Sequence, residues 1–319
     1  MGVFKLKKGY DIPLQGSAER RVEKAPKTTA VAVQPIDFRG LRPAMKVEAG
    51  DKVSRGSILF VDKQKPEILF RSPAAGTVRE VVRGERRVIQ RVIIDVAGDT
   101  AEKFDSYTAD QVNAFSTSQA KELLLNSGLW PAIRQRPFSK IADVEASPKA
   151  IIISAVDSAP LQAESDILLD GQEKTFQLGI QLLSKLTEGK IHLSVSEKTK
   201  AFFSNISGVE LHEFSGPHPA GNVGVQIHHI DRIQAPEKVW YLSPRHVSQL
   251  GSFLSTGEYP GSKTYALTGS ELEKRYYVIG TEGALVSDLV STTLQNNTQR
   301  VISGNVLTGA KSSSLRSEE

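Results

Sequence analysis

The alternation of short apolar runs with longer amphipathic runs over residues 149–255 constrains this fold more than any other feature. Lys149–Val156 is typical of a buried strand, and Gln172–Leu186 has the spacing of an amphipathic helix that ends before Gly189. Alternation of strands and helices predicts an open parallel sheet covered by helices. The same order continues in predicted strands at 191–195, 209–214 and 239–242 and predicted helices at 197–205, 224–230 and 244–255.

Short strands broken by Gly and Pro occupy residues 30–94, and they predict a small β domain with a hairpin that turns at 83–86. A helix is predicted at 118–126, closed by Gly128. Strands return at 263–268, 276–279 and 300–307. We therefore expect three domains, at 1–105 (with an N-terminal extension), 106–257 and 258–319, the last ending in a polar tail.

The chain of 319 residues contains no cysteine, which excludes iron–sulfur clusters, Cys-ligated zinc, disulfides and Cys nucleophiles. A zinc site would need three His, or His with carboxylates. His218, His228 and His229 lie close in sequence, but the adjacent pair points in different directions on a helix or a strand. We predict no metal site from them. No G-x-S-x-G or H-E-x-x-H motif is present, and no catalytic residue is predicted.

The net charge of +4 is unevenly distributed. Residues 1–100 contain 20 Lys and Arg against 12 Asp and Glu, whereas the remainder contains 20 against 24. A basic N-terminal third suits anionic lipid, nucleic acid or an acidic partner, and a solvated β surface explains it equally well because the charges are spread. No stretch approaches 18 consecutive apolar residues, so no membrane-spanning segment is predicted.

Two segments of the predicted β domain resemble the domains that carry lipoate or biotin. Glu48-Ala49-Gly50-Asp51 with Val53 and Gly56 is followed by Ser72-Pro73 with Gly76 and Val78. Lys63 falls near the hairpin at which those domains present the modified lysine, but Gln64-Lys65-Pro66 differs from the usual small apolar neighbours. Reuse of the fold as a structural module is favoured over lipoylation or biotinylation of Lys63.

The segment Ser215–Gly224 directly follows a predicted strand, at the carboxyl edge of the sheet where ligands bind in such folds. It begins with the glycine spacing of a P-loop, but Asn222 stands at the lysine position, so no nucleotide triphosphate site is predicted. A structural turn with an exposed histidine is the equally weighted alternative. The predicted ligand residues are Gly216, Pro217, His218, Pro219 and Gly221, with His218 donating to a carbonyl, and Asp157 and Pro160 after the first strand of the sheet.

Several specific segments, in the right order, resemble the A-subunit family of the Na⁺-translocating NADH:quinone oxidoreductases, a bacterial respiratory complex. Family members continue past this end with a further C-terminal region, so we expect residue 319 to be a truncation point. The matching segments are Lys8–Leu14, Arg136-Pro137-Phe138, Asp170-Gly171, Phe214–Gly221, Thr256–Tyr259 and Arg300–Gly309.

The resemblance implies a lipoyl-like barrel-sandwich β domain, a Rossmann-like open α/β sheet and a β-grasp module of the SLBB type. In related flavin-binding subunits of complex I and Rnf, a glycine-rich loop cradles flavin or nicotinamide phosphates. The corresponding stretch here is Gly128–Phe138. Leu129, Trp130 and Ile133 would fill the space of the phosphates, and prolines remove N–H donors. We therefore predict that this chain binds neither flavin nor NADH tightly.

The resemblance also implies a role. It predicts a peripheral subunit on the cytoplasmic face of the bacterial inner membrane, docked on an integral membrane subunit, with no nucleic acid as a partner. NADH, flavins, iron–sulfur clusters and Na⁺ would be handled by other subunits, and quinone is the candidate ligand of this chain. The alternatives are a purely structural scaffold and, with less support, a carrier modified at Lys63.

Overall fold

The structure, a computed structural model, describes residues 2–290 and 300–311. The chain forms two compact units. Met1–Asp11, Lys103–Ser158 and Glu164–Glu258 form the first, and Ile12–Glu102, Ala159–Ala163 and Tyr259–Glu319 form the second. The domain boundaries at 105 and 257 stay predictions. Among the described residues, no helix combines the length and the apolar character that crossing a bilayer requires.

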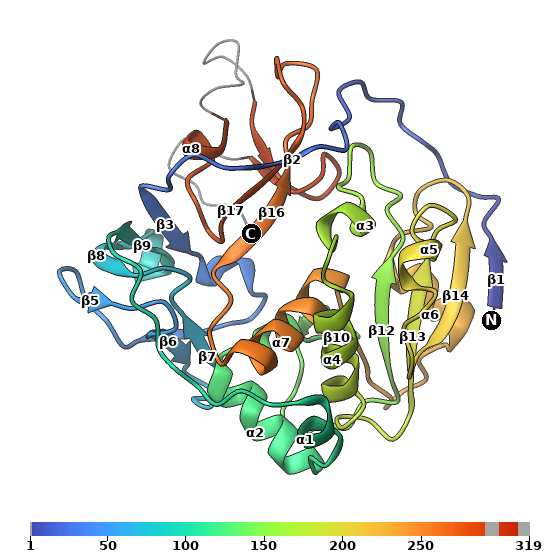
Figure 1. The fold of residues 1–319 in the computed structure, drawn as a ribbon, viewed down its shortest axis with the longest axis horizontal. Coiled ribbons are helices and arrows are strands. Elements are labelled where there is room, and N and C mark those ends of the chain that lie inside the picture. The colour runs from blue at the N-terminus through green and yellow to red at the C-terminus, as the bar shows by residue number, and fades with distance from the viewer. Residues whose placement is uncertain (1, 291–299, 312–319) are drawn as a thin grey trace. The chain divides into compact units, whose positions relative to one another are not determined.

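The first unit is built on a seven-stranded sheet with the order β1-β14-β13-β12-β15-β10-β11 (Figure 1). Its five neighbouring strands from β1 to β15 run parallel, which confirms the predicted parallel sheet. β10 and β11 lie outside the predicted strands and pair antiparallel, so the complete sheet is mixed. The strands are β1 Gly2–Lys5, β10 Arg134–Arg136, β11 Lys140–Ile141, β12 Ala150–Ala155, β13 Lys190–Val195, β14 Glu210–Ser215 and β15 Val239–Leu242.

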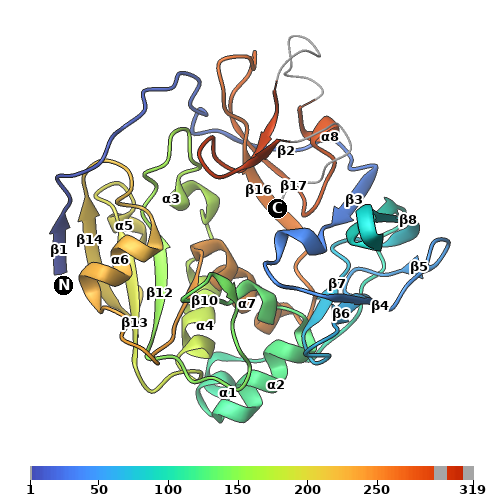
Figure 2. The ribbon, with the colours of Figure 1, turned by 180° about the vertical axis from the view of Figure 1, so that it is seen from behind.

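Helices cover both faces of this sheet. α4 (Glu173–Leu183) and α7 (Pro244–Thr256) lie on the face seen in Figure 1. α6 (Val223–Ile230) lies on the other face, seen in Figure 2, where Ile227 shares an apolar cluster with Ile152 of β12. Each of these helices agrees with a predicted one. The remaining helices of this unit are α1 Ala109–Asn113, α2 Thr117–Ser127, α3 Ser165–Leu168, α5 Lys200–Phe203 and the 3-10 helix η3 Trp130–Ala132.

α5 is a single turn, and the longer helix predicted over residues 197–205 is wrong. Side-chain hydrogen bonds explain the difference, because Thr199 Oγ1 accepts from the Ser196 backbone N–H and donates to the Ala155 carbonyl. Ser and Thr hydroxyls compete with helical hydrogen bonding when they bond to the backbone in this way. The turn over 196–199 therefore forms in place of the first helical turn.

The N-terminal strand β1 extends the sheet beyond β14, an addition that the strand pattern did not predict. Gly2–Lys5 pairs parallel with His212–Ser215, and the ring of Phe4 stacks on Phe214 with centroids 4.8 Å apart. The Leu6 N–H continues the ladder by donating to the Ser215 carbonyl at 2.9 Å. β1 therefore covers backbone groups of β14 that would otherwise form an exposed edge.

The second unit contains the predicted β domain as two small sheets, β3-β9-β8-β5 and β4-β6-β7. β8 and β9 form the predicted hairpin, which turns through the 3-10 helix η2 (Glu85–Arg87). The rings of Phe60 and Phe70 stack in the core at 4.6 Å. The elements are β3 Ala30–Val33, η1 Pro35–Asp37, β4 Pro43–Met45, β5 Lys52–Val53, β6 Ile58–Asp62, β7 Leu69–Arg71, β8 Gly76–Arg83 and β9 Ile89–Val96.

The same unit contains a smaller module around β16 (Ser262–Ala266) and β17 (Tyr277–Thr281), joined by β2 (Val22–Lys24). Tyr265 and Val278 pack there with Leu289 of α8 (Val286–Val290). The strand predicted at 300–307 is wrong in length: β18 covers only Ile302–Ser303 and pairs with β19 (Ala310–Lys311). A turn at Asn305 ends it, since the Asn305 side chain accepts from the Leu307 and Thr308 N–H groups. Residues 312–319 of the polar tail lie outside the described residues.

Two glycines allow α4 and α7 to approach closely. A Cβ added at Gly251 would overlap the Thr175 carbonyl oxygen, and one added at Gly179 would overlap the Val247 carbonyl oxygen. Backbone therefore meets backbone where the two helices cross, and no rotamer change can make room for a methyl group there.

Gly251→Ala is expected to lower the free energy of unfolding by about 2 kcal/mol, because the methyl group overpacks this crossing. Gly224→Ala in α6 is the matched control, since a Cβ there meets nothing within 4 Å. The control is expected to be neutral or stabilising by up to about 1 kcal/mol. Urea denaturation of the two variants at 25 °C checks this, and equal effects would contradict the close approach.

Candidate functional site

The carboxyl edge of the parallel strands has a point at which the strand order reverses. The chain passes from β12 to β13 and β14 on one side, and then returns to β15 on the other side of β12. Ligands in open α/β sheets bind outside the carboxyl ends of the strands at such a point. Asp157 and Ser158 directly follow β12, and the loop 216–222 follows β14. The predicted site residues therefore belong to the expected edge.

Packing against neighbouring backbone explains the glycines of this loop. Gly216 has φ of +115°, and a Cβ there would overlap the Leu6 carbonyl oxygen. A Cβ at Gly221 would overlap the carbonyl oxygen of Val156. The prolines shape the turn between them, since the Pro217 carbonyl accepts from the Ala220 N–H and the Pro219 carbonyl from the Asn222 N–H. These glycines thus have a structural reason independent of any ligand.

The N-terminal segment holds the apex of the loop. The Tyr10 N–H donates to the His218 carbonyl at 2.9 Å, and the His218 N–H donates to Asp11 Oδ1 at 3.1 Å. A Cβ added at Gly9 would overlap the His218 carbonyl oxygen. The backbone groups of His218 are therefore satisfied within the chain, and its imidazole is the part left for other chemistry.

Ser158, which the sequence did not single out, orients that imidazole. The Gly221 N–H donates to Ser158 Oγ at 2.7 Å, and the same oxygen lies 3.0 Å from His218 Nδ1. Donation of the Ser158 hydroxyl hydrogen to Nδ1 favours the tautomer that carries its hydrogen on Nε2. In that tautomer His218 offers an N–H donor, half-buried at the carboxyl edge.

Asp157 is oriented toward α3. Its carboxylate accepts from the Ser165 N–H at 2.9 Å and from the Ser165 hydroxyl at 3.1 Å. Burial, reinforced by the neighbouring carboxylates of Asp166 and Glu164, raises the pKa of Asp157 to about 6 despite these hydrogen bonds. Pro160 lies in the segment 159–163, which belongs to the second unit, and its part in a ligand site stays a prediction.

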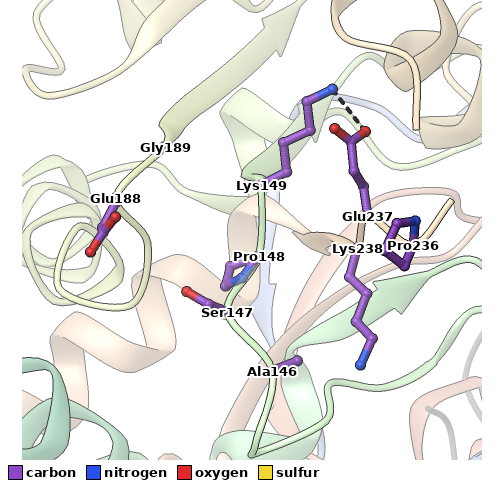
Figure 3. Close-up of a pocket in the computed structure, with 9 residues that line it drawn as sticks. All are labelled: Ala146, Ser147, Pro148, Lys149, Glu188, Gly189, Pro236, Glu237 and Lys238. Atoms are coloured by element: carbon purple, nitrogen blue, oxygen red, sulfur yellow. Dashed lines mark hydrogen bonds and ion pairs between the residues drawn. The ribbon is translucent and has the colours of Figure 1, made fainter. Parts of the chain in front are cut away.

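A groove of about 550 Å³ lies at the opposite, amino edge of the same sheet (Figure 3). Lys149 crosses it to reach Glu237 at 3.0 Å and is also paired with Asp231 at 2.6 Å. Lys238 is paired with Asp143 at 3.2 Å. This charged lining does not suit an apolar ring. The lining residues are Ala146, Ser147, Pro148, Lys149, Glu188, Gly189, Pro236, Glu237 and Lys238.

The stretch Gly128–Phe138, which the family resemblance sets against a flavin loop, is packed with side chains. Trp130 and Ile133 are fully buried, and the Trp130 indole N–H donates to the Ala142 carbonyl at 2.9 Å. The Trp130 ring packs edge-to-face on Trp240 of β15, with centroids 5.4 Å apart. This segment is therefore part of the core, and the lack of tight flavin or NADH binding stays a prediction.

Lys63 lies in the exposed turn between β6 and β7 of the second unit. Its N–H donates to the Arg42 carbonyl at 2.7 Å, and Asp62 Oδ1 accepts from the Gln64 N–H at 3.0 Å. The backbone of the turn is thus held while the Lys63 side chain is exposed. Modification of Lys63 stays a prediction.

Three family models match consecutive parts of the chain. They are described as the NqrA N-terminal barrel-sandwich hybrid domain at residues 4–97, the NqrA second alpha/beta domain at 115–259 and the NQRA C-terminal domain, of the SLBB type, at 264–314. Together they confirm the predicted fold class.

Curated relatives match nearly the whole chain. The A subunit of the Na(+)-translocating NADH-quinone reductase of Pasteurella multocida (strain Pm70) is 38% identical over 306 residues, covering 96% of this chain and 69% of that protein. The A subunit of the same reductase from Pseudomonas aeruginosa is 39% identical over 307 residues, covering 96% of this chain and 68% of its own length.

Solved structures of NAD⁺-reducing [NiFe]-hydrogenase resemble part of the chain. The H2-reduced form aligns at 13% identity with a TM-score of 0.45, covering 63% of this chain and 44% of that chain. The air-oxidized form aligns with a TM-score of 0.39.

Asp157 predicts a specific pH dependence of stability. Its pKa is higher in the folded than in the unfolded state, so stability falls as the pH rises from about 4 to about 6. Asp157→Asn removes this dependence. The free energy of unfolding of the unmodified protein, minus that of Asp157→Asn, is expected to fall by about 2 kcal/mol between pH 4 and pH 7.

Urea denaturation across this pH range measures the effect, with the exposed residue Asp170 as the control in Asp170→Asn. The control is expected to follow the unmodified protein. Parallel pH profiles for Asp157→Asn and the unmodified protein would refute the raised pKa.

Proposed function

The chain belongs to the NqrA family, the A subunits of the Na⁺-translocating NADH-quinone reductases, and we propose that it acts there as a peripheral subunit that binds quinone through His218. In this proposal NADH, flavins, iron–sulfur clusters and Na⁺ are handled by other subunits. This chain docks on them, chiefly on an integral membrane subunit, on the cytoplasmic face of the bacterial inner membrane. No residue of this chain reacts with the quinone.

The observation that carries the proposal is the orientation of the His218 imidazole by Ser158. A quinone carbonyl accepts hydrogen bonds and donates none, so it needs a fixed donor. The Gly221–Ser158–His218 chain of hydrogen bonds presents the Nε2–H group as such a donor at the strand-order reversal. Because Ser158 already holds the ring in this orientation, little reorganisation is needed when the ligand binds.

The composition supports a subunit without its own redox centre. The chain has no cysteine for an iron–sulfur cluster, and the segment 128–138 offers indole and proline where a flavin phosphate would need N–H donors. The basic N-terminal third supplies charge for docking to acidic partners or anionic lipid.

A purely structural scaffold is the second candidate, and one observation favours it. Residues 6–11 of the N-terminal segment form hydrogen bonds with the backbone of the loop and lie against Gly216. The conformation of the loop can therefore be explained without a ligand. In that case His218 serves only to join the loop to Ser158, and no small ligand binds. The two candidates differ in what happens to the Nε2–H group of His218, which an NMR titration can detect.

His218→Ala is expected to weaken binding of a short-chain ubiquinone to the full 319-residue chain by about tenfold, because one preorganised hydrogen bond is lost. Ser158→Ala is expected to weaken it less, since the imidazole remains while its orientation is no longer held. His228→Ala, on the exposed side of α6, is the matched control and should leave the affinity unchanged.

The measurement is an NMR titration that follows the imidazole signals of all six histidines. A shift at His218 with saturation supports the ligand site. No saturable shift, or unchanged affinity in His218→Ala, would remove His218 from the proposal and leave the scaffold.

Protein purified from its native host is expected to have the intact mass of the unmodified polypeptide and no flavin absorbance. Buried side chains occupy residues 129–133, which the resemblance sets against a flavin loop, and the Lys63 turn departs from the carrier pattern. Mass spectrometry and the visible absorption spectrum check both points. Stoichiometric flavin, micromolar NADH affinity, or a lipoyl or biotinyl mass increment that is lost in Lys63→Arg would overturn the corresponding assignment.

A further inference from the structure

The face of the sheet under α6 changes from apolar to polar between β12 and β13. On β12 this face carries Ile152, which packs in an apolar cluster with α6. Register places His192 of β13 beside Ile152, and Glu210 of β14 beside His192. Two residues further along the strands, Ser194 lies beside His212 on the same face. Buried faces of parallel sheets are normally apolar, so this polar cluster requires an explanation.

The side chains of three of these residues converge. His192 Nδ1 lies 2.9 Å from His212 Nε2 and 3.5 Å from Glu210 Oε2, and the three potential ligand atoms all lie within 4.8 Å of one another. The two imidazoles are buried, with 5% and 9% of their residues exposed, whereas the Glu210 side chain is 44% exposed. The cluster is therefore a nearly closed site with one side open through Glu210.

Two buried polar atoms in this cluster have no protein partner among the described residues. They are His212 Nδ1 and the hydroxyl oxygen of Ser194. Buried polar groups without a partner are uncommon. His212 Nδ1 is not one of the three converging atoms, since it faces Gly2 of β1, so these two atoms show a polar interior around the cluster and are not themselves ligands.

We propose that His192, His212 and Glu210 form a binding site for a first-row divalent cation of the Zn²⁺ type. Two imidazole nitrogens and one carboxylate oxygen are a known ligand set for zinc, with water in the fourth position. Tetrahedral ligands on zinc are separated by about 3.3 Å, given bond lengths of about 2.05 Å. The separations of 2.9 and 3.5 Å differ from this by a few tenths of an ångström.

Burial disfavours the charged form of both imidazoles: it lowers the pKa of His192 and, together with the neighbouring His192, the pKa of His212. In the metal-free protein one of the two facing nitrogens donates its hydrogen to the other at 2.9 Å. When the ion binds both nitrogens, that hydrogen moves to the second nitrogen of the donating ring, so each imidazole stays neutral and offers a lone pair.

Glu210 supplies the negative charge and the route of entry. Its Oε1 is paired with Lys190 Nζ at 2.5 Å, which leaves Oε2 facing His192. Lys190 is two-thirds exposed, so its own charge is solvated and the ion pair holds the carboxylate in place from outside. Asp231 is near enough to act electrostatically on His192, and it adds negative charge on the side of α6.

The N-terminal strand leaves space for this arrangement. Gly2 lies in register with His212, and a Cβ at Gly2 would come within 2.9 Å of His212 Nδ1. Phe4 packs beside the ring of His212 at 6.0 Å between centroids. A bound ion would join β13 to β14 under this cover, which gives it a structural role at the amino end of β14, apart from His218.

The test uses the full chain, stripped of metal, and Zn²⁺ titrated against a chromogenic chelator. We expect one equivalent to bind and the thermal unfolding midpoint to rise with Zn²⁺ concentration. His212→Ala should weaken binding by about a hundredfold and Glu210→Gln by about tenfold. Because the Glu210 side chain is partly exposed, Glu210→Gln is expected to fold even if His212→Ala does not.

His228→Ala, on the solvent side of α6, is the matched control and should bind like the unmodified protein. Lys190→Ala should weaken binding less than either ligand variant, because Lys190 only holds Glu210 from outside and supplies no ligand. Co²⁺ provides a second readout, since a four-coordinate site gives visible d–d bands that Glu210→Gln should shift. Absence of one-equivalent binding, binding unaffected in both ligand variants, or binding lost in His228→Ala would overturn the proposal.

Discussion

The pairing of β1 with β14 is the interaction on which both candidate sites depend. Four N-terminal residues extend the parallel sheet and place Phe4 on Phe214, and the following residues lie against the loop that leaves β14. At the amino end of β14, the same strand brings Gly2 beside His212. One strand addition therefore shapes the His192–His212 cluster at one end and the His218 loop at the other.

The contacts that the N-terminal segment makes differ between the two ends of β14. At the carboxyl end, backbone groups and the Asp11 side chain satisfy the His218 amide, and only the imidazole is directed elsewhere. At the amino end the contacts are between side chains on one face of the strands, where His212 Nε2 faces His192. Side chains that converge, rather than glycine content, distinguish the candidate sites from an ordinary turn.

Periodicity predicted the elements that are buried on both sides, such as β12 and α7, because their apolar pattern is long and regular. Periodicity did not predict β1, β10 or β11, because these strands are too short to show a pattern. Pairing with β14 positions β1, and pairing with β15 positions β10. The sequence left the loop 216–221 open between a ligand site and a structural turn, and it could not show that the backbone of Leu6 lies against Gly216. The alternation His192-x-Ser194 and Glu210-x-His212 in two predicted strands was visible, and it would have predicted a shared polar face.

The packing of Trp130 makes the segment before β10 part of the core of the first unit. The indole packs on Trp240 and donates to the Ala142 carbonyl, so it joins the segment before β10 to β15 and to β11. Replacing Trp130 with glycine would leave a cavity in this core, and such truncations of buried aromatics cost about 3–5 kcal/mol. A glycine at this position would not by itself supply the run of backbone N–H groups that holds a phosphate, because the adjacent Pro131 has no N–H to donate. The core packing and the missing donor therefore both support the proposal that this chain does not bind flavin.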